Sequence, residues 1–204
     1  AFPDSNLSVS AITEKDKEHL EFGTKHDVDF VAVSFVRNAS DIKTVRDLVP
    51  NDIKVIAKIE LKAALDNIAE ILDVADGVMV ARGDLGVQLP LEQVPFVQKQ
   101  ILDAANKKGK ISITATEMLQ SMKSSYRPTR AEVTDITNAI LEGSDAVMLS
   151  AETAIGDNPN RVVEVMSLIC AETDSRNDTS SLLSKEDSKE DSSDANKNTE
   201  EENS

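Results

Sequence analysis

The stretch KVIAKIELKAALDNIAEILDVADGVMVAR, residues 54–82, contains two short apolar runs separated by an amphipathic segment. The runs VIAKI and GVMVA are almost continuous in Val, Ile, Ala and Met, which is typical of strands that are buried on both faces. Between them, Leu61, Leu65 and Ile68 recur at the spacing of one helix face. The stretch therefore predicts a strand–helix–strand unit whose two strands are parallel.

The same pattern recurs on both sides of this stretch. Residues 1–171 contain five apolar runs of strand length, Val28–Val36, Lys54–Glu60, Ala75–Arg82, Lys110–Glu117 and Ser144–Glu152. Gly109 and Gly143 are placed to end helices before the last two runs. We expect one helix over Glu14–Lys25, before the first strand, and another from Arg161 to about residue 171. The sequence thus predicts an α/β fold of about five β/α units.

The composition restricts the class of protein. Among 204 residues, 37 Asp and Glu outweigh 22 Lys and Arg, and the net charge is -15. The negative electrostatic field of such a chain disfavours nucleic acid and anionic membranes as partners. The chain has no apolar run near the roughly 20 residues that span a bilayer, and its first residues do not resemble a signal peptide. With Cys170 as the single cysteine, no internal disulfide can form, and we expect a cytoplasmic protein.

The charge is concentrated at the carboxyl end. Residues 172–204 contain eleven acids, four bases and eight serines. Such a segment cannot bury enough apolar surface to fold by itself, so we expect a disordered acidic tail after a barrel-like domain over residues 1–171. The tail could act as a phosphorylatable or partner-binding arm, or serve solubility alone.

Polar residues follow each predicted strand. They include Ser34, Lys58 with Glu60, Gly83 with Asp84, and Thr116. Right-handed crossovers bring the carboxyl ends of parallel strands to one edge of the sheet. Ligands bind at that edge both in open doubly wound sheets and in closed barrels. These residues therefore outline one candidate site.

Lys58 and Glu60 are two residues apart, so their side chains project from the same face of a strand. They could form a simple salt bridge at the rim, and Asp84 alone could be a helix cap. Glu60 and Asp84 together suit Mg²⁺, which takes one or two carboxylates and completes its shell with substrate and water. A cation beside a lysine and the free amides around Gly83 favours phosphoryl transfer.

Six ordered motifs resemble the pyruvate kinase family. They are VSFVR (33–37), AKIE (57–60), MVARGDLG (79–86), ITATEMLQSM (113–122), RPTRAE (127–132) and DAVMLSAETAIG (145–156). The resemblance implies a partial (β/α)8 TIM barrel, corresponding to strands four to eight of the catalytic domain. The family's lid and carboxyl-terminal domains have no counterpart in this sequence.

The resemblance also implies roles for the residues at the strand ends. Glu60 and Asp84 match the ligands of the catalytic Mg²⁺ or Mn²⁺, and Lys58 matches the lysine that contacts the transferring phosphoryl group. The amides of Gly83 and Asp84 and the hydroxyl of Thr116 match the groups that hold the substrate carboxylate. Ser34 lies near the rim of the site. K⁺ is expected for the family, but its ligands lie on strands without a counterpart here.

The expected function is the magnesium-dependent conversion of phosphoenolpyruvate and ADP into pyruvate and ATP in glycolysis, with this chain alone incomplete and inactive. A non-catalytic half-barrel that binds or assembles with a partner is the alternative. A magnesium-dependent lyase barrel acting on pyruvate or phosphoenolpyruvate is a weaker one. The family forms homo-oligomers, so Arg127 and Arg130 are candidates for a contact between subunits.

Overall fold

The computed structural model of the chain describes residues 12–177, in which one five-stranded sheet forms the centre. Its strands are β1 (Phe30–Val33), β2 (Lys54–Ile59), β3 (Gly77–Ala81), β4 (Ile111–Ala115) and β5 (Ala146–Met148). All four pairings between neighbours are parallel. Each strand lies within one of the predicted apolar runs, so the five predicted strands are confirmed.

Helical segments precede, connect and follow the strands. They are α1 (Glu14–Lys25), α2 (Ala39–Arg46), α3 (Lys62–Asp66), α4 (Ile68–Val74), α5 (Arg82–Gln88), η1 (Leu91–Gln93), α6 (Val94–Lys107), η2 (Gln120–Lys123), α7 (Arg130–Leu141) and α8 (Ala151–Ala154). A last helix occupies residues 159–177. The predicted bounds of α1 and the predicted helix ends before β4 and β5 are confirmed, since Thr13 forms a capping box with Asp16 and both Gly109 and Gly143 have positive φ. The last helix is longer at both ends than the predicted stretch from Arg161 to about residue 171.

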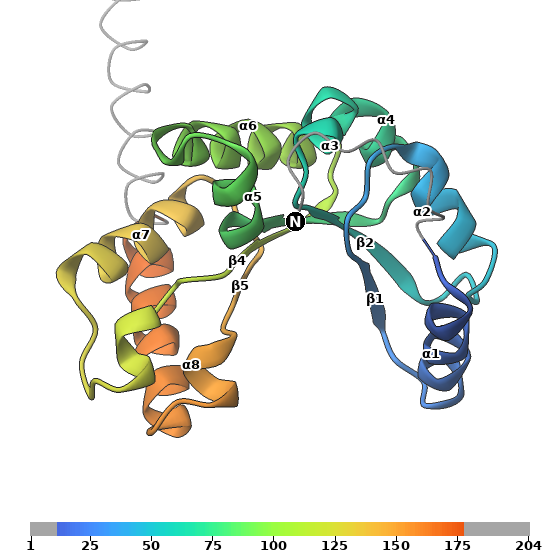
Figure 1. Cartoon of the computed structure of the whole chain (residues 1–204). Helices are drawn as coiled ribbons and strands as arrows, with labels where there is room; N and C mark the ends of the chain where they lie inside the picture. Colours follow the sequence, from blue (N-terminus) through green and yellow to red (C-terminus); the bar gives the residue numbers. More distant parts are fainter. Residues whose placement is uncertain (1–11, 178–204) are drawn as a thin grey trace, which may run out of the picture.

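The strand order decides the type of sheet. The strands neighbour one another in chain order, β1-β2-β3-β4-β5. Because right-handed crossovers that always step in one direction place every helix on the same face, this order belongs to a barrel and not to a doubly wound sheet. Figure 1 shows the curved sheet as an arch with the helices on its outer side. The expected partial barrel is therefore confirmed.

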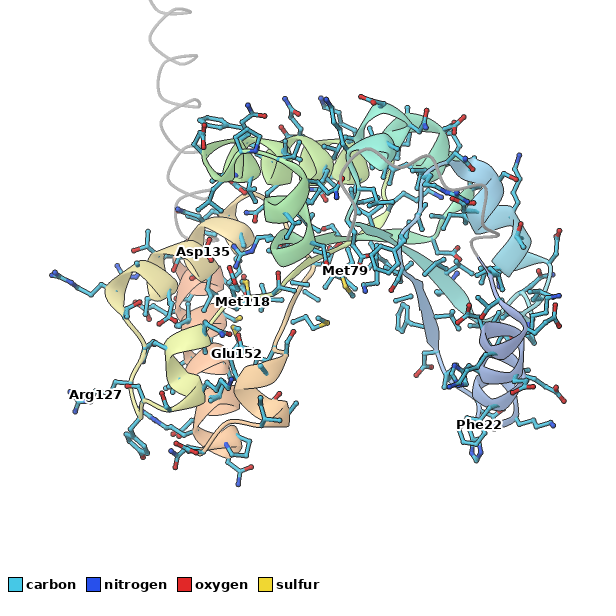
Figure 2. All side chains as sticks on the ribbon, in the orientation of Figure 1. Phe22, Met79, Met118, Arg127, Asp135 and Glu152 are labelled. Carbon is cyan, nitrogen blue, oxygen red and sulfur yellow. The ribbon has the colours of Figure 1, made fainter. Side chains whose placement is uncertain are left out.

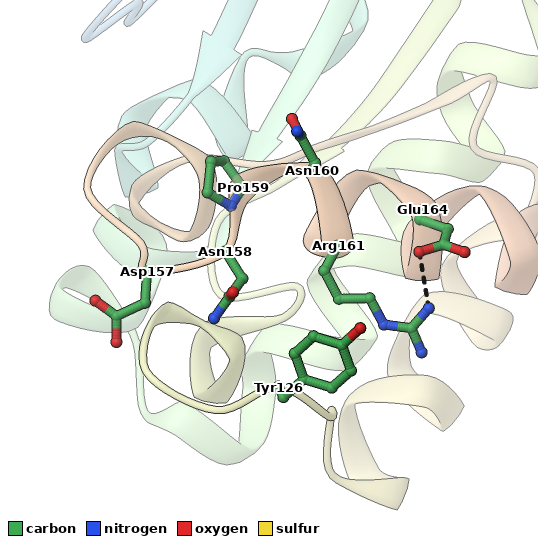
Figure 3. A pocket seen from close by; sticks show the side chains of 7 residues that line it. All are labelled: Tyr126, Asp157, Asn158, Pro159, Asn160, Arg161 and Glu164. Carbon is green, nitrogen blue, oxygen red and sulfur yellow. Dashed lines mark hydrogen bonds and ion pairs between the residues drawn. The ribbon is translucent and has the colours of Figure 1, made fainter.

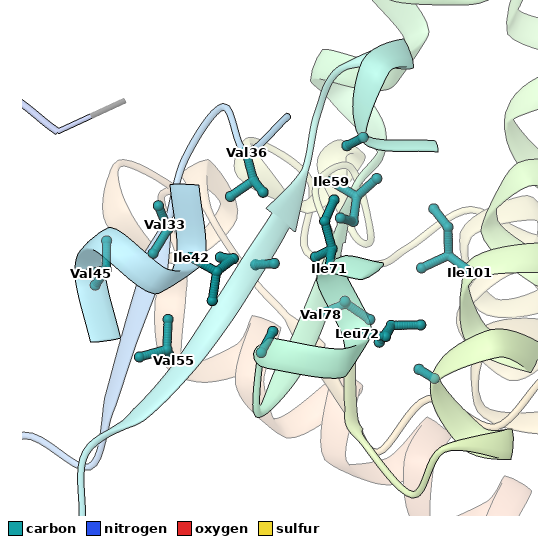
Figure 4. Close-up of a cluster of buried hydrophobic side chains, with 14 of the residues drawn as sticks. Val33, Val36, Ile42, Val45, Val55, Ile59, Ile71, Leu72, Val78 and Ile101 are labelled. Atoms are coloured by element: carbon teal, nitrogen blue, oxygen red, sulfur yellow. The ribbon is translucent and has the colours of Figure 1, made fainter. Parts of the chain in front are cut away.

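The largest apolar cluster fills the space between the outer face of the sheet and the helices. Alternate residues of β2, namely Val55, Ala57 and Ile59, point into this cluster, where they meet residues of α2, α4 and α6 (Figure 4). Ile56 lies on the opposite, inner face and packs with Met79 and Ala115. Since side chains alternate along a strand, Lys58 and Glu60 share the inner face with Ile56.

A separate cluster holds the carboxyl-terminal part of the fold together. Met118, Leu119 and Met122, from the segment after β4, pack against α7 and the last helix. That helix continues to residue 177, so residues 172–177 of the predicted tail are helical, whereas the remainder lies outside the described residues. Over residues 12–177, no helix is long and apolar enough to cross a membrane.

Candidate active site

The register of the sheet places the predicted site residues at one edge. Lys58 pairs with Met79, and Ala81 pairs with Ala115, so the segments after β2, β3 and β4 emerge next to one another. Ser34 directly follows β1 at the same edge. Parallel strands in register thus gather residues that are up to 82 positions apart in the sequence, from Ser34 to Thr116.

Ser34, Lys58 and Glu60 form one connected group. The ammonium of Lys58 lies 2.6 Å from Oε1 of Glu60 and donates a 2.8 Å hydrogen bond to Oγ of Ser34. The other carboxylate oxygen of Glu60 accepts a 2.6 Å hydrogen bond from the backbone N–H of Phe35. The predicted salt bridge at the rim is therefore real, and it extends to the end of β1.

This group carries a buried charge. The side chain of Glu60 is only 2% exposed, whereas that of Lys58 is 25% exposed. Burying an ion pair is costly unless its remaining polar atoms are satisfied, and here the Phe35 amide and the Ser34 hydroxyl meet that need. Phe35, whose N–H donates this hydrogen bond to Glu60, adopts the left-handed φ of 55°. Nothing in the sequence pattern predicted this use of Phe35.

Gly83 and Thr116 form a second group on the neighbouring strand ends. The backbone N–H of Gly83 donates a 2.8 Å hydrogen bond to Oγ1 of Thr116. The Gly83 amide, which the resemblance assigns to a substrate carboxylate, is thus engaged within the protein, while the Thr116 hydroxyl keeps its own proton to donate. Of these two groups, the Thr116 hydroxyl is the one that still has a proton to donate to a substrate carboxylate.

The turn after β4 is strained. Thr116 has φ 72° and Glu117 has φ 55°, so two consecutive residues with side chains lie in the left-handed region. Each such residue costs of order 1–3 kcal/mol and persists only where its surroundings hold it. Thr116 is β-branched, which makes its positive φ especially unfavourable. Strain of this kind is concentrated at functional sites, which agrees with the predicted role of Thr116.

Two charged residues support this turn, and sequence reasoning gave neither a role. The guanidinium of Arg82 donates to the carbonyl oxygens of Thr116 and Glu117. The carboxylate of Glu152, fully buried, accepts hydrogen bonds from the backbone N–H of Leu119 and of Ser150. Both were visible as polar residues at strand ends, but only the fold shows what they hold.

Asp84 is the remaining predicted site residue. It lies in the first turn of α5, next to Gly83, and is exposed. Within residues 12–177, Asp84 forms no hydrogen bond or ion pair with Lys58, Glu60 or Thr116. The helix-cap alternative is wrong, because the N-cap of α5 is Ala81 and receives no side-chain hydrogen bond.

The carboxylates at this edge are donors of the type that a hard divalent cation takes. Within residues 12–177, no three or more His, Cys, Asp or Glu side chains gather as a protein-only metal cage would require. Glu60 and Asp84 instead offer one carboxylate each from the ends of β2 and β3. Mg²⁺ is bound in this way when substrate oxygens and water complete its shell.

A separate surface cavity of about 410 Å³ lies elsewhere, at the start of the last helix (Figure 3). Its lining includes Tyr126, Asp157, Arg161 and Glu164. Arg161 stacks over the ring of Tyr126 at 5.1 Å and pairs with Glu164 at 2.8 Å. None of the predicted site residues lines this cavity, so it is distinct from the strand-end site.

The strands of this parallel sheet neighbour one another in chain order, and polar groups gather at its carboxyl edge. This arrangement defines the class of β/α-barrel proteins. Residues 1–163 match the family model described as pyruvate kinase, barrel domain. The chain therefore belongs to the pyruvate kinase family, as its motifs indicated. It is 50% identical over 185 residues to pyruvate kinase of Staphylococcus aureus strain USA300, and equally to that of strain NCTC 8325. These alignments cover 89% of this chain but only 32%, about a third, of the length of those relatives.

Proposed function

We propose that this chain supplies the metal- and phosphoenolpyruvate-binding edge of a cytoplasmic, glycolytic pyruvate kinase. The observation that carries the proposal is the placement of the Lys58 ammonium, 2.6 Å from Glu60 and 2.8 Å from Ser34, at the carboxyl edge of the sheet. In the proposed reaction the bond between phosphorus and the enol oxygen of phosphoenolpyruvate breaks. A bond to the terminal phosphate oxygen of ADP forms, and a proton adds to the enolate carbon to give pyruvate.

The residues of this chain would mainly position groups and offset charge, which is how proteins catalyse phosphoryl transfer. Lys58 would neutralise the phosphoryl oxygens as they leave the enol oxygen. The Thr116 hydroxyl would donate to the substrate carboxylate, supported by the Gly83 amide at 2.8 Å. Mg²⁺ or Mn²⁺, held by Glu60 and Asp84, would polarise the phosphoryl group. K⁺ would bind through residues that this chain does not provide.

The family match favours this reaction over the lyase alternative. A chimaera distinguishes the proposed reaction from the alternative of a non-catalytic half-barrel. Residues 1–163 of this chain, which are the residues that match the barrel model, would replace the corresponding segment of the S. aureus relative. We expect the chimaera to synthesise ATP from phosphoenolpyruvate and ADP with Mg²⁺ and K⁺, and Lys58→Met to depress turnover more than substrate binding.

Lys99→Met is a matched control for the chimaera, because Lys99 is more than half exposed on α6 and pairs only with Asp103. It should leave turnover unchanged. An inactive but folded chimaera that still binds Mg²⁺ would favour the non-catalytic alternative. The isolated chain, which spans about a third of its relatives, is expected to show no turnover by itself.

The metal assignment is tested on the isolated chain by titration calorimetry with Mg²⁺. We expect weak binding in the wild type and weaker binding in both Glu60→Gln and Asp84→Asn. Asp103→Asn makes the same charge change on α6 and should bind like the wild type. If both site variants bind Mg²⁺ as the wild type does, the two carboxylates do not hold the metal.

We also propose that the family's homo-oligomeric state extends to proteins containing this chain. Arg130 begins α7 and Arg127 precedes it, and both are exposed. Figure 2 shows Arg127 pointing away from the fold. Their exposure leaves both guanidinium groups accessible to a neighbouring subunit.

A further inference from the structure

The feature that carries a further inference is the contact between Arg82 and the strained turn after β4. Arg82 is the first residue of α5, and its side chain is only 11% exposed. Its guanidinium reaches across to the neighbouring strand end, where Nη2 donates to the carbonyl of Thr116 at 2.8 Å and to that of Glu117 at 3.3 Å. A second nitrogen, Nε, donates to the Thr116 carbonyl at 3.2 Å.

Arg82 is itself held from the far side. Its Nη1 lies 2.7 Å from both carboxylate oxygens of Asp135, in α7, and 3.5 Å from Oε1 of Gln98, in α6. The Sδ atom of Met118 lies 2.9 Å from Nη2. Figure 2 shows Asp135 and Met118 in the same part of the fold. The planar guanidinium is therefore pinned between α7 and the turn that it supports.

The dipeptide Arg82–Gly83 contacts Thr116 at two points. The Arg82 side chain binds the Thr116 carbonyl, and the Gly83 backbone N–H binds the Thr116 hydroxyl at 2.8 Å. Because the carbonyl and the hydroxyl are both restrained, the side chain of Thr116 has one orientation relative to the Gly83 amide. A left-handed pair such as Thr116 and Glu117 would otherwise relax, since isolated residues with side chains avoid that region.

We propose that Arg82 is a positioning residue that keeps the Thr116 hydroxyl, which the Gly83 N–H holds at 2.8 Å, oriented to donate to a small organic carboxylate. This inference rests on the proposed function, in which the Thr116 hydroxyl donates to the substrate carboxylate. Arg82 does not touch the substrate. It acts by holding the carbonyls of the turn, and Asp135 acts by holding Arg82.

Lysine cannot replace Arg82 in this role. An ammonium is a point charge with rotating donors, whereas the guanidinium fork spans two carbonyls and a carboxylate in one plane. Arg82→Lys therefore keeps the positive charge and removes the geometry. Arg82→Met removes both. Asp135→Asn leaves Arg82 in place and weakens only its anchor, so its effect should have the same direction and be smaller.

The matched control is Arg46, at the opposite end of the sheet. It too is a partly buried arginine, 24% exposed, that donates to two backbone carbonyls, of Pro50 and Ile53, and pairs with Asp76. Arg46→Lys should resemble Arg82→Lys in its general effect on stability. It has no contact with the Thr116 turn.

The first measurement is amide hydrogen exchange at Gly83 in the isolated full chain, followed by NMR under conditions where each variant is folded. We expect Gly83 to exchange at least about tenfold faster in Arg82→Lys than in the wild type, because its hydrogen bond to Thr116 loosens. Arg46→Lys should change the rate less than about twofold. Equal rates in the two lysine variants would overturn the inference. If Arg82→Met does not fold, Arg82→Lys and Asp135→Asn still decide it.

The second measurement is titration of the same proteins with oxalate, a small dicarboxylate, in the presence of Mg²⁺. Arg82→Lys should weaken oxalate binding at least about tenfold while leaving the affinity for Mg²⁺ alone unchanged, a split that general destabilisation would not produce. Unchanged oxalate affinity in Arg82→Lys would contradict the inference. If the wild type binds no oxalate at all, the carboxylate role of this edge in the proposed function fails, and Gly83 exchange still decides whether Arg82 holds the turn.

Discussion

Replacing Lys58 by methionine should destabilise the protein because it leaves the Glu60 carboxylate without its cation. Glu60 is 2% exposed and relies on Lys58 at 2.6 Å and the Phe35 N–H at 2.6 Å. Removing one partner of a fully buried ion pair costs about 3–5 kcal/mol. Lys58 is 25% exposed, so water can partly replace it, and we expect a smaller cost of about 2 kcal/mol.

The double variant separates this effect from simple loss of packing. Glu60→Gln removes the charge but keeps an acceptor for the Phe35 N–H, and we expect a cost of about 1 kcal/mol. Lys58→Met combined with Glu60→Gln buries no unpaired charge and should be little less stable than Glu60→Gln alone. The double-mutant cycle should then give a coupling of about 2 kcal/mol between the two positions.

The free energy of unfolding of the wild type, the two single variants and the double variant is measured by urea unfolding at pH 7, followed by circular dichroism. The slope of each transition checks that the unfolded states are comparable. For a chain of this size, about 2 kcal/mol corresponds to a fall in Tm of about 4–8 °C. Lys99→Met, which breaks an exposed pair on α6, should change stability by less than about 0.5 kcal/mol. Additive single variants, or a Lys58→Met variant as stable as the control, would refute the reasoning.

Two further predictions concern stability. Gly77→Ala should cost about 1–3 kcal/mol in urea unfolding, because a Cβ there would lie 2.6 Å from the Ile111 carbonyl oxygen, whereas Gly86→Ala, with room for a Cβ, should cost nothing. Glu132 has a pKa below its ordinary value of 4.5, because burial, which raises the pKa, is outweighed by hydrogen bonds led by those from Ser121. Its contribution is therefore fully present above about pH 4.5 and lost as the pH falls through the lowered pKa. The stability difference between wild type and Glu132→Gln should be largest near pH 7 and shrink below pH 4.5, and a difference that does not change with pH would contradict this origin.

The sequence by itself determined the local structure and the edge at which the site lies. Strands that are covered on both faces are typically continuous apolar runs, so all five strands could be predicted from the pattern of apolar residues along the chain. The spacing of Lys58 and Glu60 placed both side chains on one face, and their ion pair confirms it. The order of the motifs was sufficient to identify the family.

Only the tertiary structure decided the strand order and the contacts that cross between strands. Hydrophobic periodicity alone allows both a barrel and a doubly wound sheet, because it does not determine which neighbour a strand will have. The motifs implied the barrel by resemblance, and the order β1-β2-β3-β4-β5 shows it. Arg82 and Thr116 are 34 residues apart, and their contact depends on the register of β3 against β4. Local periodicity reports which side of an element is buried, whereas the partner on that side is set by how the whole chain packs.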